Sequence, residues 1–116
     1  MDSIFTEDDI VSRYTDEDAI EDGILVKLER DGKPMSRYIK LATTNLLESS
    51  DYMEDDQFNV PNILDLIKQC HWIMIRAKKW DWFYSGKIEL PRGEKQEVFI
   101  EQNNSGGYTV MLPEDH

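Results

Sequence analysis

The clearest hydrophobic pattern in the chain has the period of an α-helix and covers residues 61–79. Apolar side chains recur there every three or four residues and form one stripe, made of Ile63, Ile67, Cys70, Met74 and Ala77 and widened by Leu66 and Ile73. Such a stripe is typical of a helix that packs one face on a core. Asn59 and Pro61 mark its start, because proline is favoured in the first helical turn. The pattern predicts one long amphipathic helix.

Beyond Trp80 the hydrophobic period changes to two, which is the period of a strand with one buried face. The alternating apolar positions are Trp82, Tyr84, Ile88 and Leu90 in a first segment, Val98 and Ile100 in a second, and Tyr108, Val110 and Leu112 in a third. Pro91-Arg92-Gly93 and residues 103–107 supply turn-forming residues between them. This pattern predicts a three-stranded antiparallel meander.

The N-terminal half predicts two short helices. Thr15 is suited to an N-cap and Gly23 to a C-terminal stop, so a helix is expected over residues 16–22. A second short helix is expected over residues 43–49. Residues 50–59 are polar and acidic and predict a loop.

A β-hairpin is expected between these two helices. Residues 24–30 alternate as a strand does, and Asp31-Gly32 is a strong signal for a hairpin turn. The partner strand is expected over residues 35–41. Pro34 argues against a long central strand at this point, because proline cannot donate to a ladder.

These elements predict an α+β fold. A C-terminal three-stranded antiparallel sheet packs on the one long helix, and the short N-terminal helices and the hairpin lie beside it. The 116 residues fit a single domain, 1–116. The chain has one cysteine, so it forms no internal disulfide, and a reducing compartment fits. No run approaches the roughly 20 apolar residues of a membrane span, so a cytoplasmic location is expected.

The charge is concentrated in the first half of the chain. Residues 1–66 hold 17 acidic and 6 basic side chains, whereas residues 67–116 hold 7 of each. The formal net charge of −11 therefore comes from the first half. A clustered acidic surface repels nucleic acid and attracts basic protein surfaces. We therefore expect no direct binding of DNA or RNA.

The acidic clusters are the candidate partner-binding residues: Glu7, Asp8, Asp9, Asp16, Glu17, Asp18, Glu54, Asp55 and Asp56. Carboxylates spread over a surface can mimic a nucleic-acid backbone, which carries a charge about every 1.7 Å of duplex axis. The alternative is that they form a solvated surface and cap helices. The sequence leaves both interpretations open.

Trp72 is the one unusual residue of the predicted helix. It lies opposite the apolar stripe, and Lys68, Arg76 and Lys79 are its neighbours on that face. An aromatic side chain among cations is typical of a binding hot spot. Alternatively, the acidic N-terminal segment covers the indole and pairs with these cations.

No catalytic motif is recognisable. Cys70 and His71 are adjacent on a helix and point about 100° apart, so they do not form a nucleophile and base pair. Residues 51–56 are acidic but lack the ligand spacing of a calcium loop. One cysteine and two histidines are too few for a structural zinc site. We expect no enzyme activity, no cofactor and no metal.

Residues 18–26 and 108–115 resemble the two ends of an uncharacterised family of small phage, plasmid and bacterial proteins, a domain of unknown function. Residues 39–43 and the helix through Trp72 resemble its middle more loosely. The resemblance implies a mobile genetic element as the setting and brings no known catalytic residues.

Two non-enzymatic functions follow as hypotheses. In the first, the protein binds and inhibits a basic, nucleic-acid-handling host defence protein, as an anti-restriction or anti-CRISPR inhibitor does. In the second, it is a small phage regulatory or structural protein that acts through oligomer contacts, for which a homodimer is one form.

Overall fold

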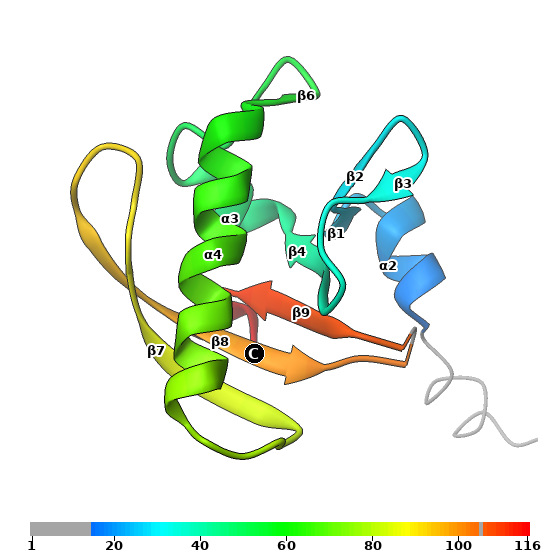
Figure 1. The fold of residues 1–116 in the computed structure, drawn as a ribbon. Helices are drawn as coiled ribbons and strands as arrows, with labels where there is room; N and C mark the ends of the chain where they lie inside the picture. The colour runs from blue at the N-terminus through cyan, green and yellow to red at the C-terminus, as the bar shows by residue number, and fades with distance from the viewer. Residues whose placement is uncertain (1–14, 105) are drawn as a thin grey trace, which may run out of the picture.

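The computed structural model describes residues 15–104 and 106–116 and shows an α+β fold built on one mixed sheet (Figure 1). The sheet has five strands in the order β1-β4-β9-β8-β7. Their bounds are Leu25–Lys27 for β1, Ile39–Thr43 for β4, Tyr108–Met111 for β9, Lys95–Gln102 for β8 and Phe83–Glu89 for β7. All neighbouring pairs are antiparallel except β4 and β9, which are parallel.

The prediction of a C-terminal three-stranded antiparallel sheet is therefore wrong. The strands β7, β8 and β9 do pair in sequence order, but β9 also pairs with β4, and β4 pairs with β1. Pro34 does not disturb the pairing of β4, because it lies in the separate strand β3 (Lys33–Pro34), before β4 begins. A parallel partner so far away in sequence leaves no local period or turn signal.

Gly107 shows how closely β9 approaches β4. A Cβ atom at Gly107 would lie 2.9 Å from the carbonyl oxygen of Tyr38, so a larger residue would push the strands apart. The Tyr108 N–H donates to that same carbonyl at 2.8 Å. The register then shifts between Ile39 and Leu41.

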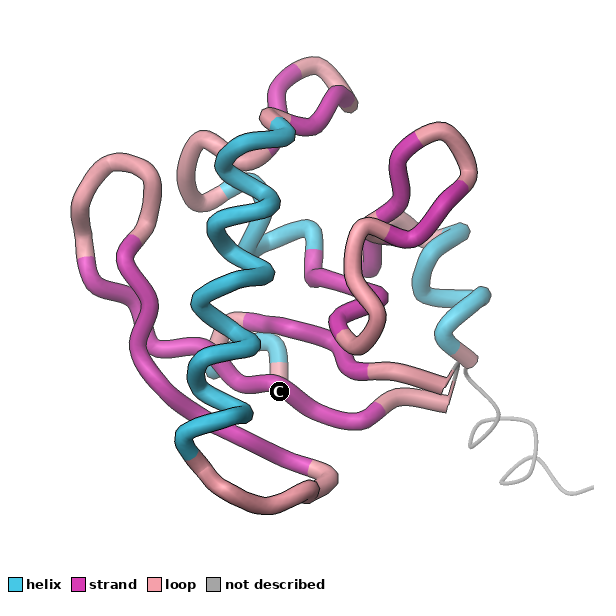
Figure 2. The backbone as a smooth tube through the Cα atoms, in the orientation of Figure 1, coloured by secondary structure: helices cyan, strands magenta, loops and turns pink. Residues whose placement is uncertain are grey.

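The long helix α4 spans Val60–Arg76 and crosses one face of the sheet, as Figures 1 and 2 show. Asn59 caps it by accepting the Asn62 N–H at 3.3 Å. The predicted stripe is buried at Ile63, Ile67, Cys70 and Met74. The helix ends three residues before the predicted position 79, and Ala77 is exposed. The buried sheet residues that complete this core are Tyr84, Ile88, Val98, Ile100, Tyr108 and Val110.

The smaller elements surround this helix and sheet layer. The helices α2 (Asp16–Glu21) and α3 (Thr44–Glu48) begin after the N-caps Thr15 and Thr43. Two short ribbons project from the body in Figure 2: β2 (Glu29–Arg30) with β3, and β5 (Met53–Glu54) with β6 (Gln57–Phe58). A 3-10 turn, η1, covers Pro113–Asp115.

Side chains of the opposite sheet face are also covered in part. Strand alternation places Phe83 and Phe99 on that face, and their rings lie 5.0 Å apart. The His116 ring contacts both, at 5.4 Å from each. Its Nε2 lies 3.3 Å from a carboxylate oxygen of Glu101. The end of the chain is thus packed against the sheet.

Candidate functional site

The predicted acidic residues fall in three places. Glu7, Asp8 and Asp9 lie outside the described residues. Asp16, Glu17 and Asp18 form the first turn of α2, where carboxylates stabilise the positive end of the helix. Asp18 has a structural role, because its carboxylate accepts the Thr15 N–H at 3.0 Å in a capping box. Glu17 is exposed.

Asp55 and Asp56 form the turn of the β5–β6 ribbon, and Glu54 precedes them as the last residue of β5. Asp55 and Asp56 have φ angles of 53° and 63°, so both adopt the left-handed conformation of a type I′ turn. All three side chains are exposed. Figure 1 shows this ribbon beyond the N-terminal end of α4, whereas α2 lies beside β1 at another edge. The structure does not bring the two acidic groups together.

Trp72 lies on the outer face of α4, and 54% of it is exposed. Lys68 and Arg76, one helical turn away on either side, are exposed as well. The alternative in which the N-terminal segment covers this indole concerns residues that the structure does not describe.

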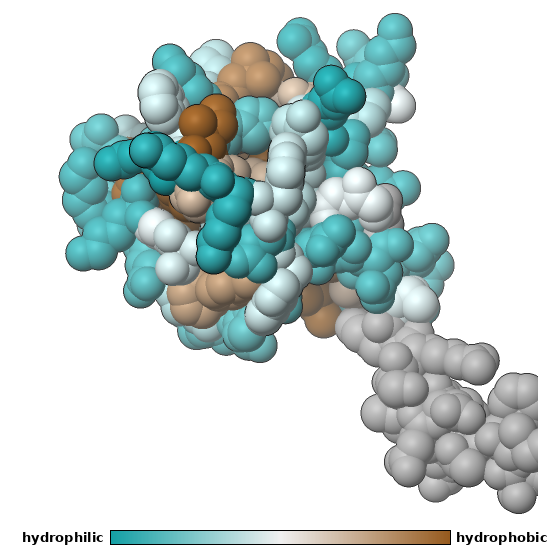
Figure 3. Space-filling view, turned by 60° about the horizontal axis from the view of Figure 1, so that its bottom comes forward, coloured by the Kyte–Doolittle hydropathy of each residue, from teal (hydrophilic) through white to brown (hydrophobic). Residues whose placement is uncertain are grey.

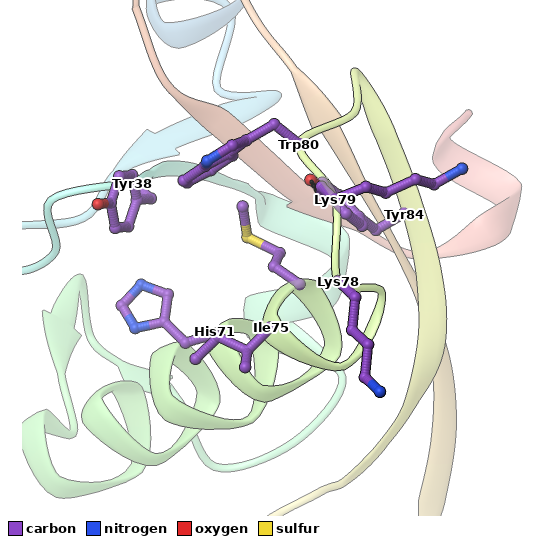
Figure 4. Close-up of a pocket in the computed structure, with 8 residues that line it drawn as sticks. Tyr38, His71, Ile75, Lys78, Lys79, Trp80 and Tyr84 are labelled. Atoms are coloured by element: carbon purple, nitrogen blue, oxygen red, sulfur yellow. Dashed lines mark hydrogen bonds between the residues drawn. The ribbon is translucent and has the colours of Figure 1, made fainter.

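A largely apolar groove is a feature that sequence analysis did not predict. We call it the aromatic groove; it has a volume of about 450 Å³ and lies between the C-terminal end of α4 and the loop before β4. Its apolar and aromatic lining residues are Tyr38, His71, Met74, Ile75, Trp80 and Tyr84. Lys78 and Lys79 complete its lining at the end of the helix. Figure 4 shows Tyr38 and Trp80 on one side and His71 and Ile75 on the other.

Large apolar side chains are exposed around this groove. Trp80 is 70% exposed and Ile75 is 65% exposed. Trp82, two residues further along the chain and outside the groove lining, is 59% exposed. Figure 3, which brings the lower end of the molecule forward, shows separate brown patches divided by white and teal side chains on this face. Large apolar side chains that stay exposed beside a groove are typical of a binding site.

Two buried tyrosines hold the loop that carries Trp80. The Tyr84 hydroxyl donates to the Lys79 carbonyl at 2.8 Å and accepts the Asp81 N–H at 2.7 Å. The Tyr108 hydroxyl donates to the Asp81 carbonyl at 2.5 Å. Both backbone positions that flank Trp80 are therefore fixed from the core. An aromatic side chain that is exposed on a fixed loop is already positioned for binding.

The end of α4 turns the chain toward this loop. Lys78 follows the helix with a φ of 59°, the left-handed conformation that commonly ends a helix and usually belongs to glycine. Its N–H donates to the Ile75 carbonyl at 3.0 Å. The Trp80 ring then lies 5.3 Å from the Tyr38 ring, measured between centroids.

Ser36 fixes the other wall of the groove. Its hydroxyl oxygen accepts the N–H groups of Tyr38 at 3.1 Å and Ile39 at 3.0 Å. The same oxygen lies 3.0 Å from Nε2 of His71 on α4. The His71 ring packs edge-on against Tyr38 at 5.8 Å. This network ties the loop that carries Tyr38 to the helix.

Neither Ser36 nor Cys70 is arranged as a nucleophile. With both lone pairs of the Ser36 oxygen occupied by N–H donors, its proton is the group that reaches Nε2, and the hydroxyl serves as a structural link. Burial lowers the pKa of His71, which keeps its ring neutral at pH 7. Burial raises the pKa of the Cys70 thiol to about 12, so the thiolate is absent.

The described residues contain no group of three or more histidine, cysteine or acidic side chains placed to hold a metal ion. In the same part of the chain, no helix has the length and apolar character needed to span a membrane.

One feature of the sequence, the position of Trp80, could have indicated the groove. Trp80 belongs neither to the helical stripe nor to the alternating strand that follows, so a large aromatic residue stood in a predicted linker. The positions of Tyr38 and His71 in the groove had no such signal, because they depend on how the loop before β4 packs on α4.

Comparisons with protein-family models, curated proteins and solved structures found no match. The family resemblance stays a prediction.

Proposed function

We propose that the protein is a non-enzymatic binding protein of a mobile genetic element, which docks acidic side chains on a basic, nucleic-acid-handling protein of the host cytosol and blocks it. An anti-restriction or anti-CRISPR inhibitor is the concrete form. Nucleic acid itself is not a partner in this proposal, because a net charge of −11 repels phosphates.

The observation that carries the proposal is the turn of the β5–β6 ribbon. No ion pair between described residues involves Glu54, Asp55 or Asp56, so these carboxylates are available to a partner. Opposed charges steer the encounter of two proteins and raise the association rate. The exposed carboxylates of Glu17 and Glu21 on α2 extend the acidic character to a second edge.

The chain itself offers a comparison for this turn. The β2–β3 ribbon has Asp31-Gly32 in the same two-residue, left-handed geometry, which is a favoured pair. The β5–β6 ribbon differs from this pair only at the second position, where Asp56 stands in place of the glycine that adopts this conformation without steric cost. A carboxylate in place of the glycine that would favour stability is what the proposal expects if Asp56 contributes to binding.

The test separates turn stability from charge. Asp55→Asn combined with Asp56→Gly creates the preferred turn pair and removes two charges. We expect an unchanged or higher melting temperature and a slower association with the partner captured from nuclease-treated host extract. The control is Glu94→Gln with Glu97→Gln, which removes the same charge at exposed positions elsewhere.

If the Asn-Gly variant binds the captured partner as fast as the wild type does, the acidic ribbon is not part of the contact. Equal losses in both variants would mean that only net charge matters. A captured partner that has no basic surface would contradict the proposed class of target.

A further inference from the structure

We propose that the aromatic groove is a second docking site, which accepts an acidic segment of another protein with an aromatic or large aliphatic side chain as its anchor. The site is distinct from the acidic ribbon, because the groove lies at the C-terminal end of α4 and the ribbon beyond its N-terminal end (Figure 1).

The size and lining of the groove fit one large side chain with its neighbours. Its volume of about 450 Å³ is in the range of ligand sites, roughly 300–1,000 Å³. Tyr38 and Trp80 present rings tilted by 54° to each other, and Ile75 adds an aliphatic wall. Aromatic residues dominate the energetics of such anchor pockets.

The positive charge around the groove favours acidic residues on either side of the anchor side chain in the bound segment. Residues 67–82 carry four basic side chains and one acidic one, the reverse of the chain as a whole. Lys78 lines the groove and takes part in no ion pair between described residues, whereas Lys79 lies 3.2 Å from Asp81. Arg37 lies over the outer wall, 5.7 Å from the centre of the Tyr38 ring. Carboxylates that flank the anchor would meet these cations.

The same charge argues against a second copy of this chain as the occupant. A two-fold symmetric contact places each patch against its own copy. Two groove surfaces would then bring like charges together within the Debye length of roughly 10 Å, which is destabilising. An acidic segment of a different protein meets the opposite charge.

A selection from random peptides tests the chemistry without knowledge of the natural partner. Displayed peptides of about a dozen residues are selected on the wild-type chain after depletion on a Trp80→Ala variant. We expect enriched peptides that combine Asp or Glu with Trp, Phe or Leu. Their affinity should fall by about 30-fold in Trp80→Ala, the effect of a strong hot spot.

Two matched controls, at Trp82 and Lys87, identify the contact. Trp82→Ala removes another largely exposed tryptophan, which lies outside the groove lining, and should leave peptide affinity unchanged. Lys78→Glu should weaken binding and reduce its dependence on salt, whereas Lys87→Glu, an exposed reversal in the middle of β7, should not. Because Trp80 is 70% exposed, Trp80→Ala should fold, and its melting temperature verifies this.

Each other result overturns the proposal. Enriched peptides that are basic or uncharged would exclude an acidic partner segment. Failure to enrich any peptide over Trp80→Ala would mean that the groove is not a docking site for peptides. Self-association that Trp80→Ala abolishes would assign the groove to a second copy, and binding of a single-stranded oligonucleotide that the same variant abolishes would assign it to base stacking.

Discussion

The hydroxyl of Thr43 donates a 2.7 Å hydrogen bond to the carboxylate of Asp115, 72 residues later in the chain. The same carboxylate accepts the side-chain amide of Asn45 at 2.8 Å and the Leu112 N–H at 3.3 Å. Because Thr43 is both the end of β4 and the N-cap of α3, one carboxylate joins the centre of the sheet to the C-terminal turn.

Asp115→Ala should therefore destabilise the fold by about 1–3 kcal/mol, since it leaves the partly buried donors without an acceptor. Denaturant unfolding measures the difference. The matched control is Glu114→Ala, which removes an exposed carboxylate next to it and should change stability by less than about 0.5 kcal/mol. Equal effects of the two variants would mean that the Asp115 network contributes nothing specific.

Tyr52 and Tyr84 are both buried but differ in how their hydroxyls are used. No described residue forms a hydrogen bond with the Tyr52 hydroxyl, whereas the Tyr84 hydroxyl makes two. Tyr52→Phe should leave stability unchanged or raise it, because it removes a buried polar group without a partner. Tyr84→Phe should cost about 1–2 kcal/mol. A larger loss for Tyr52→Phe in thermal melts would contradict this assignment.

Ile67 and Trp72 lie on opposite faces of α4. Ile67 is buried in the core, so Ile67→Ala should cost about 2–5 kcal/mol. Trp72 is half-exposed, so Trp72→Ala should cost much less, about 1 kcal/mol or below. The melting temperatures of the two variants show whether Trp72 contributes to the stability of the fold. If both variants are equally destabilised, the indole of Trp72 is a structural residue and not an available contact.

The buried environment of His71 predicts a dependence of stability on pH. Burial lowers its pKa in the folded protein, so the unfolded chain binds more protons as the pH falls below about 6.5. The stabilisation is complete above that pH and is lost as the pH falls. Between about pH 8 and pH 5, the wild type should therefore lose more free energy of unfolding than His71→Gln does. Parallel curves of the free energy of unfolding against pH for the two proteins would exclude His71 as the source of the pH dependence.

Several local elements were predictable because their causes are local, but residues 50–59, which the sequence predicts as a loop, contain the β5–β6 ribbon. Thr15 and Asp18 form a capping box within one turn, and Asp31-Gly32 forms its hairpin turn between adjacent residues. The stripe from Ile63 to Met74 needs only the helical period to place it on the core. In each case, the residues that decide the structure stand next to each other or one turn apart.

Tertiary contacts alone decided the sheet and the groove. The strand β4 pairs with β1 on one edge and with β9 on the other. Residues 39–43 carry no mark that distinguishes a hairpin strand from such a central one. Trp80 faces Tyr38 because Tyr84 and Tyr108 bind the backbone beside it from strands that come later in the chain. The sequence by itself determined the charge, the amphipathic helix and the turns, which depend on composition and short spacings. Distant segments come together only when the whole core packs, so their contacts produce no periodic pattern of hydrophobic residues in the sequence.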